Sequence, residues 1–171
     1  YSEAKFANMA NLYNSMILAK NEKNDLIYFV EDDYVHTKIS ILEMLFSYEK
    51  FSSICKKEIF LLPADYPYLY SKNNYTKIFL GHITHWRLVN ESLVTFLTSK
   101  EIINTYLDKF MEMATKWEDP WEAPLHKIYE KVPCFSPIPS LSMHCANINS
   151  EYGLPPNINW KKIWDDSNDY K

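Results

Sequence analysis

Residues 26–33 constrain the fold more than any other part of the chain, because an apolar run is followed directly by three acids. Leu26-Ile27-Tyr28-Phe29-Val30 has the length of a strand and no charged residue, which is typical of a strand buried on both faces of a mostly parallel sheet. Glu31-Asp32-Asp33 then ends this run. Ligands of α/β proteins gather outside the carboxyl ends of such strands, so we expect the chemistry of the protein at these three acids.

The front half of the chain predicts alternating helices and strands. Apolar residues at helical spacing occupy residues 2–20, and a second helix opens at Thr37. Residues 59–62 read as a second buried strand. The apolar residues that share one face of the second helix are Ile39, Leu42, Leu45 and Phe46.

The back half is expected to be less regular. Residues 75–80 and 85–98 predict short strands with loops, and Ser99 caps a further helix. Five prolines after Val132 predict an irregular C-terminal part. The fold class is therefore α/β, with a mostly parallel sheet flanked by helices.

Length and composition fit one domain over residues 1–171. A chain of 171 residues with 47% apolar side chains can build one core. Because the chain starts on a helix, whereas nucleotide-binding units normally start on a strand, we also consider it a fragment of a longer fold. The net charge of −4, without a basic stretch, argues against a nucleic-acid partner.

The apolar runs and the cysteines bear on the compartment. The longest apolar runs fall far short of the roughly 20 residues of a membrane span. Three widely separated cysteines without CxxC spacing predict neither a disulfide framework nor a zinc site. We expect a cytoplasmic protein with at most peripheral contact with a membrane.

The three acids after the first strand predict a metal site. Side-chain alternation points Glu31 and Asp33 the same way and Asp32 the opposite way. Carboxylate oxygens suit Mg²⁺ or Mn²⁺, which bind one or two carboxylates together with substrate phosphates. Three adjacent acids would also repel one another without a cation. The alternative is a solvated acidic turn that caps the following helix.

The segment LIYFVEDDYVH (residues 26–36), followed by a helix, resembles the metal-binding strand end of GT-A glycosyltransferases. In those enzymes the acidic motif is usually DxD, and Glu31 takes its first position here. The similarity continues in order through nearly all of the chain, in THWRLVNESLVTFLT (84–98), WED (117–119), PSLSMHC (139–145) and LPPNINW (154–160). The strand–helix–strand unit with which GT-A enzymes begin, and which holds the nucleoside, has no counterpart in this sequence.

The resemblance implies roles for two further acids and one histidine. His144 would complete the metal or diphosphate shell around Asp33, although a lone histidine there also fits a half-buried structural role. Asp119 would be the general base of an inverting transfer, with Glu118 as the fallback. Asp119 equally fits the N-cap of a helix that starts at Pro120.

Aromatic and basic residues supply candidates for donor or acceptor binding. Arg87 is the single arginine, and its planar fork could pair with a diphosphate or simply with Glu91. Trp86 could stack on a sugar or fill the core. The remaining candidates are His85, Asp65, Trp117 and Trp121.

The leading function is a metal-dependent glycosyltransferase. It would transfer a sugar from a nucleotide-sugar donor to a glycan or lipid-linked acceptor, with Mn²⁺ or Mg²⁺ stabilising the diphosphate leaving group. The alternatives are a non-catalytic transferase-like module or partner subunit, and a metal-dependent phosphohydrolase that would need a second cluster of metal ligands.

Overall fold

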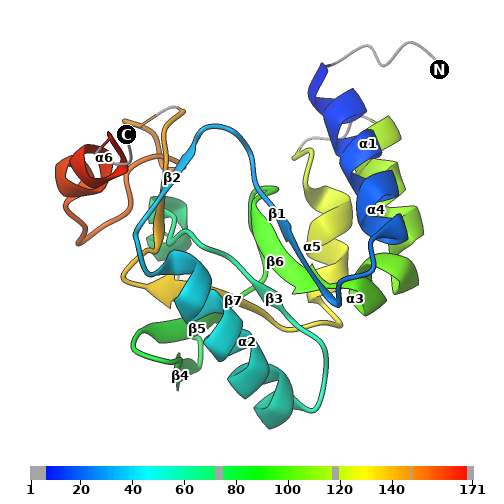
Figure 1. Ribbon diagram of the computed structural model, residues 1–171, viewed down its shortest axis with the longest axis horizontal. Coiled ribbons are helices and arrows are strands. Elements are labelled where there is room, and N and C mark those ends of the chain that lie inside the picture. Colours follow the sequence, from blue (N-terminus) through cyan, green and yellow to red (C-terminus); the bar gives the residue numbers. More distant parts are fainter. Residues whose placement is uncertain (1–6, 72–74, 117–119, 147, 169–171) are drawn as a thin grey trace.

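The computed structural model describes residues 7–71, 75–116, 120–146 and 148–168. Helices and strands follow one another along the chain as in Figure 1. In order, they are α1 (Ala7–Asn21), β1 (Leu26–Phe29), β2 (Tyr34–His36), α2 (Ser40–Cys55), β3 (Phe60–Leu61), the 3-10 helix η1 (Pro67–Tyr70), β4 (Ile78–Leu80), β5 (His85–Val89), β6 (Phe96–Ser99), α3 (Lys100–Thr105), α4 (Leu107–Thr115), α5 (Ala123–Tyr129), β7 (Cys134–Ile138), β8 (Ser142–His144) and α6 (Trp160–Asn168).

The main sheet is mixed, with the strand order β1-β6-β3-β7-β5-β4. The α/β class is confirmed, but the expectation of mostly parallel pairing is wrong. Only β3 and β7 pair in parallel among the described strands, whereas the other four pairings are antiparallel. The physical reason is that β6 lies between β1 and β3, and β5 lies outside β7, each with reversed direction.

Three strands nevertheless end at the same edge of the sheet. Because β1 and β3 are both antiparallel to β6, they run in the same direction, and β7 runs with β3. Backbone hydrogen bonds join the segments that follow these strands: the N–H of Leu141 donates to Pro63 O, and the N–H of Cys145 donates to Asp33 O at 2.7 Å. Residues distant in sequence are therefore gathered beside the acidic turn.

Helices cover both faces of the main sheet (Figure 1). Alternation along β3 sends Phe60 to one face and Leu61 to the other, and both side chains are fully buried. The face of Phe60 packs against α1, α3, α4 and α5, and the face of Leu61 packs against α2. The predicted buried strand at residues 59–62 is confirmed, as is the Ser99 cap, whose hydroxyl accepts from Ile102 N–H.

Strand β1 lies at the edge of the sheet rather than in its centre. Its first three residues are half-buried, and only Phe29 is buried. The expectation of a strand buried on both faces is therefore wrong for β1. An apolar run of this length fits an edge position because α1 packs over the same end of the core, where Leu12 and Met16 contact the cluster that contains Phe29.

The C-terminal part is more regular than its prolines predict, since it holds β7, β8 and α6. The backbone carbonyl of Phe135 in β7 accepts a hydrogen bond from Leu62 N–H, just after β3, so this backbone group faces the β3 side. Pro137, two residues later, faces the same side. Because β3 has ended there, Pro137 removes no hydrogen bond from the β3–β7 ladder.

Helix α2 buries polar residues beside the core residues Met44, Tyr48 and Phe51, and it exposes a second set of apolar residues. Glu43 is buried, and Ser40 and Ser47 are fully buried, on the side that faces the sheet. The predicted apolar residues do lie together on one face of the helix, but this face is exposed to solvent. They are Ile39, Leu42, Leu45 and Phe46. Sequence periodicity identifies such a face without saying what covers it.

The Glu43 carboxylate adds polar contacts to this buried side of the helix. It accepts from the backbone N–H groups of His82, Ile83 and Thr84 at 2.9–3.2 Å. It also accepts from Trp86 Nε1 at 3.1 Å and Ser47 Oγ at 3.0 Å. Gly81 permits this close approach, because a Cβ there would lie 2.4 Å from both Ser47 Oγ and Trp86 Nε1. Helix α2 is thereby locked to the loop between β4 and β5.

No helix in the described part of the chain combines the length and the apolarity needed to cross a lipid bilayer.

We predict that Glu43→Gln lowers the free energy of unfolding by about 3 kcal/mol, because the amide NH₂ would face buried N–H donors. Urea denaturation of both proteins measures the difference. The control is Glu49→Gln on the exposed side of the same helix, for which we expect a change within about 0.5 kcal/mol. Equal stability of Glu43→Gln and the unsubstituted protein would contradict the structural role of this carboxylate.

Candidate functional site

The acidic turn after β1 has the side-chain alternation that the sequence predicts. Glu31 and Asp33 are half-buried, and Asp32 is exposed. The turn connects β1 in the main sheet to β2, which pairs with β8 in a separate two-stranded sheet. Asp33 therefore lies where the two sheets meet.

Asp33 and His144 contact each other across this junction. His144 Nε2 lies 3.0 Å from Asp33 Oδ2, and the other ring nitrogen, Nδ1, lies 3.0 Å from the carbonyl oxygen of Tyr152. A carbonyl oxygen can only accept, so Nδ1 carries a proton. This arrangement directs Nε2 at the Asp33 carboxylate, as in metal-binding histidines whose second nitrogen is held by a carbonyl.

Aromatic rings hold the histidine in place. Tyr34 is the register partner of His144 in the β2–β8 pair, and the two rings stack with centroids 4.8 Å apart. The Tyr34 hydroxyl lies 2.5 Å from that of Tyr66, which is also buried. Stacking on Tyr34 thus fixes the plane of the His144 ring, and the hydrogen bond to the Tyr152 carbonyl fixes the rotation of the ring within that plane.

Asp33 Oδ1 is buried and has no hydrogen-bond partner among the described residues. A buried carboxylate oxygen without a partner is unfavourable, because desolvation is not compensated. The same carboxylate presents its second oxygen to His144. The site therefore has an unused anionic acceptor beside an oriented imidazole, which fits a bound cation.

Glu31 is electrostatically disfavoured at this site. Burial raises the pKa of the Glu31 carboxyl, and the negative charge of Asp33 raises this pKa further. Thr95 opposes the shift, since its hydroxyl lies 3.3 Å from Glu31 Oε2, and its oxygen accepts from the Glu31 backbone N–H. A cation near Asp33 would relieve the repulsion between the two carboxylates.

A cleft of about 780 Å³ opens beside the acidic turn. Its walls are α1, strand β1 with Val30, and the single residues Val94 and Trp121. All three acids line it. The indole of Trp121 is fixed by a hydrogen bond from Nε1 to Met113 O at 2.6 Å. The volume is within the usual range for small-molecule and cofactor sites.

The protein's own ligands for a metal are few. In residues 7–71, 75–116, 120–146 and 148–168, no three side chains of histidine, cysteine, aspartate or glutamate converge as a metal-binding group. Asp33 and His144 form a pair, while Glu31 turns to Thr95. Such a pair fits an ion that takes its remaining ligands from water and substrate phosphates, as Mg²⁺ commonly does.

Arg87 and Asp65 do not line the cleft beside the acidic turn, and Arg87 lines a different cleft, so their predicted roles in ligand binding stay predictions. The two side chains make a buried ion pair, and Tyr70 closes it by donating to Asp65 and placing its ring 4.1 Å from the Arg87 guanidinium carbon. Asp65 has no exposed surface. The single arginine thus neutralises a buried acid. It pairs with Asp65 and not with Glu91, which was the predicted alternative partner.

The predicted sugar-stacking role of Trp86 is wrong, because this side chain is fully buried and its Nε1 donates to the Glu43 carboxylate. A ring with no exposed surface cannot stack on a sugar. His85 is exposed at the start of β5 and does not line the cleft beside Asp33. The core alternative for Trp86 therefore holds, and of the predicted donor- or acceptor-binding residues that the structure describes, Trp121 lies at the cleft.

Trp117, Glu118 and Asp119 lie outside the described residues, so the predicted base and its fallback stay predictions. Residues that the sequence did not single out are Tyr34, Tyr66, Thr95 and the carbonyl of Tyr152. Tyr34 directly follows the acids, which is a weak signal. The others are distant in sequence, and only Thr95 lies in one of the quoted segments, THWRLVNESLVTFLT (84–98).

The sequence matches no family model, and no curated protein matches it either. The resemblance to GT-A glycosyltransferases therefore depends on the motifs quoted above.

We predict that Glu31→Gln increases the free energy of unfolding at neutral pH in metal-free buffer. The folded state raises the pKa of Glu31, so it disfavours the ionised carboxylate that the unfolded chain accepts. The increase in the free energy of unfolding should be largest above the folded-state pKa of Glu31. It should vanish below about pH 4, where this carboxyl is protonated in both the folded and the unfolded state. Thermal unfolding across this pH range measures the effect. Lower stability of the variant at neutral pH would show that the charge of Glu31 is needed by the fold.

Proposed function

We propose that the protein is a metal-dependent glycosyltransferase that uses a nucleotide-sugar donor. One observation carries the proposal: Asp33, which follows β1, holds a buried carboxylate oxygen with no hydrogen-bond partner in the described part of the chain, and it contacts an oriented histidine. This pair suits a divalent ion whose other ligands are the phosphates of a bound diphosphate. Mn²⁺ or Mg²⁺, when bound, would stabilise negative charge on the diphosphate leaving group.

The surroundings of Asp33 support a donor of this size. The adjoining cleft of about 780 Å³ is lined by all three acids at one end and by Trp121. A flat indole with fixed orientation offers a surface for a sugar or a base. Asp33 and His144 would bind the ion, and Glu31 would add negative charge behind them.

The acceptor side of the proposal rests on the WED motif. Asp119 would accept the proton of the acceptor hydroxyl, opposite the leaving group, which would make the transfer inverting. The acceptor would be a glycan or a lipid-linked glycan. Glu118 is the alternative base.

Two other functions compete with this proposal. A phosphohydrolase with two metal ions would need a second ligand cluster, and the described residues hold no such group of three acids, histidines or cysteines. A non-catalytic module would keep the fold without binding a donor. Titration with sugar nucleotides separates all three, because release of phosphate from simple esters marks the second and absence of binding marks the third.

We predict that Asp33→Asn weakens Mn²⁺-dependent binding of UDP- or GDP-sugars by about a hundredfold, because the variant loses the anionic ligand of the ion. Isothermal titration with and without Mn²⁺ measures the change. The control is Asp25→Asn, at the opposite end of β1, where the exposed acid is far from the turn along the strand. The control should alter affinity by less than about threefold.

Unchanged donor binding by Asp33→Asn would overturn the metal site. A loss of folding in this variant, seen as a collapse of the melting transition in metal-free buffer, would show a structural role instead. We expect the melting temperature in metal-free buffer to stay the same or rise, since the substitution removes repulsion with Glu31.

We predict that Asp119→Asn leaves donor binding intact and slows sugar transfer by about a hundredfold, because a positioned base is lost. Donor titration and product analysis with a panel of glycan and lipid-linked acceptors measure the two effects separately. Full transfer activity in this variant would leave the N-cap role of Asp119 as the better account.

A further inference from the structure

Stacking on Tyr34 leaves two orientations open to the ring of His144. A half-turn of the ring about its Cβ–Cγ bond keeps it in the same plane, so the contact with Tyr34 is compatible with both orientations. Only one of them places Nε2 at Asp33 Oδ2 and Nδ1 at the carbonyl oxygen of Tyr152, each at 3.0 Å. These two hydrogen bonds therefore select the orientation in which Nε2 faces the acidic turn.

Of the two hydrogen bonds, the one to Tyr152 is the bond that could persist with an ion at the site. The Nε2 of a ligating histidine presents its lone pair to the ion, so it cannot also donate to Asp33. Nδ1 keeps its proton and its acceptor. The position of the Tyr152 carbonyl thus matters most for the orientation of His144 towards a cation.

The Tyr152 carbonyl belongs to a tight turn over residues 148–154. The N–H of Leu154 donates to Ile148 O at 3.1 Å and closes the turn. Gly153 permits this closure, because a Cβ on it would lie 2.4 Å from Ile148 O. These contacts set the shape of the turn, whereas its place relative to the histidine requires a contact with another part of the molecule.

Tyr68, in the 3-10 helix η1, makes two such contacts with the turn. Its backbone N–H donates to the carbonyl oxygen of Glu151 at 3.0 Å. Its ring, which is buried, lies 5.2 Å from the ring of Tyr152 between centroids. Tyr152 itself is 40% exposed, so a buried ring on its inner side is what limits its movement. One residue thus holds both ends of the 151–152 peptide bond.

Tyr68 is itself fixed by the aromatic side chains behind His144. Its ring stacks on that of Tyr66, with centroids 5.6 Å apart and planes at 19°. The Tyr66 hydroxyl lies 2.5 Å from the hydroxyl of Tyr34, whose ring stacks on His144. The contacts therefore close into a circuit, in which the order is His144, Tyr34, Tyr66, Tyr68, Tyr152 and again His144. A change at one member of the circuit is transmitted to the histidine.

We propose that Tyr68 is a positioning residue of the candidate metal site. It holds the Tyr152 carbonyl where that oxygen accepts from Nδ1 of His144, and it thereby keeps Nε2 directed at Asp33. The effect on metal affinity rests on the proposed function, whereas the effect on the orientation of the histidine does not. Loss of a group that orients a ligating histidine typically weakens metal binding by about tenfold to a hundredfold.

The first measurement follows the ring N–H of His144 in the metal-free full chain, by NMR with ¹⁵N-labelled histidine. The chain has five histidines, and the Nδ1–H signal is assigned by its absence from His144→Gln. We expect this proton to exchange with solvent at least about tenfold faster in Tyr68→Leu and in Tyr152→Ala, because each loses the ring contact that holds the carbonyl. Tyr152→Ala removes a partly exposed ring and keeps the carbonyl, so it keeps the experiment decisive if Tyr68→Leu fails to fold.

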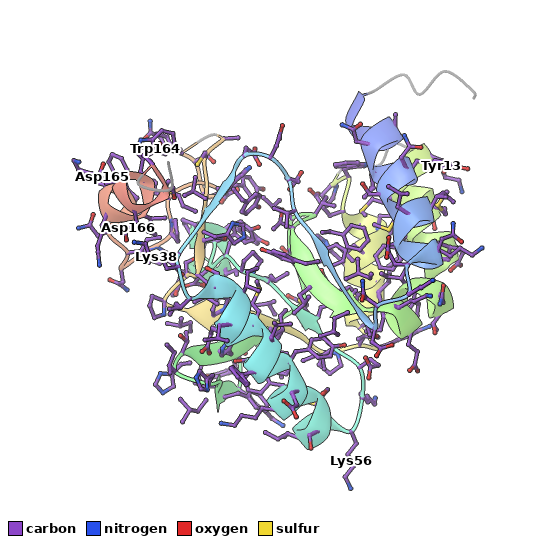
Figure 2. The ribbon with its side chains drawn as sticks, viewed as in Figure 1. Tyr13, Lys38, Lys56, Trp164, Asp165 and Asp166 are labelled. Atoms are coloured by element: carbon purple, nitrogen blue, oxygen red, sulfur yellow. The ribbon has the colours of Figure 1, made fainter. Side chains whose placement is uncertain are left out.

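Two further variants separate positioning from general loss of stability. Tyr68→Phe keeps the ring, so it should exchange like the unsubstituted protein. The matched control is Tyr48→Leu, since Tyr48 is 5% exposed and Tyr68 is 6% exposed, but Tyr48 belongs to α2 on the other face of the main sheet. Figure 2 shows α2 leading away from α6, which packs on β2, towards Lys56. We expect this control to be less stable and to leave exchange of the histidine proton within about threefold.

The second measurement is the affinity for Mn²⁺ alone, by isothermal titration. We expect binding about tenfold weaker in Tyr68→Leu and in Tyr152→Ala. Tyr68→Phe and Tyr48→Leu should bind the ion like the unsubstituted protein.

Unchanged exchange of the His144 ring proton in the folded Tyr68→Leu and Tyr152→Ala variants would overturn the proposal. Equal acceleration in Tyr48→Leu would overturn it too, because the effect would then be one of stability alone. Faster exchange with unchanged Mn²⁺ affinity would overturn the role of Tyr68 at the metal site. If the exchange results are as expected and Mn²⁺ does not bind the unsubstituted protein, the proposed function fails and the positioning of His144 stands.

Discussion

Strand β6 runs antiparallel between β1 and β3, and the arrangement of the candidate site depends on this insertion. Because both neighbours are antiparallel to β6, they share one direction, and β7 extends that direction through its parallel pairing with β3. The segments after β1, β3 and β7 therefore meet at one edge and are tied by backbone hydrogen bonds, including the one from Cys145 N–H to Asp33 O. Without these bonds, His144 would have no fixed position relative to the acids.

At this edge of the sheet the carboxylates of Glu31 and Asp33 repel each other. Two half-buried carboxylates lie close enough for Asp33 to raise the pKa of Glu31, and one oxygen of Asp33 is buried without a partner among the residues that the structure describes. The other buried acids that the structure describes have partners, although burial still raises the pKa of Asp65. Asp65 has Arg87 and Tyr70, and Glu43 has a group of N–H and hydroxyl donors. The contrast between these compensated acids and Asp33 is the physical reason to assign ligand binding to the acidic turn.

Helix α2 shows how a buried charge determines which surface a helix exposes. A carboxylate that binds the loop between β4 and β5 must face that loop, and the core residues Met44 and Phe51 lie on the same side of α2, so this side is buried. The opposite side, with Leu42 and Phe46, is left outside. Burial of these two side chains against the sheet would require Glu43 to lose its donors, which is more costly than the exposure of two apolar side chains.

The sequence by itself determined the α/β class, the buried strand at residues 59–62, the cap at Ser99 and the alternation of Glu31, Asp32 and Asp33. These follow from local rules, since alternation and capping act over a few residues. The tertiary structure decided what local rules do not contain: the direction of β6, the edge position of β1 and the side of α2 that is buried. It also decided that Arg87 pairs with Asp65 and that His144, separated from Asp33 by 111 positions, lies 3.0 Å from it. Such pairings depend on which distant strands are neighbours, and that is set by the packing of the whole core.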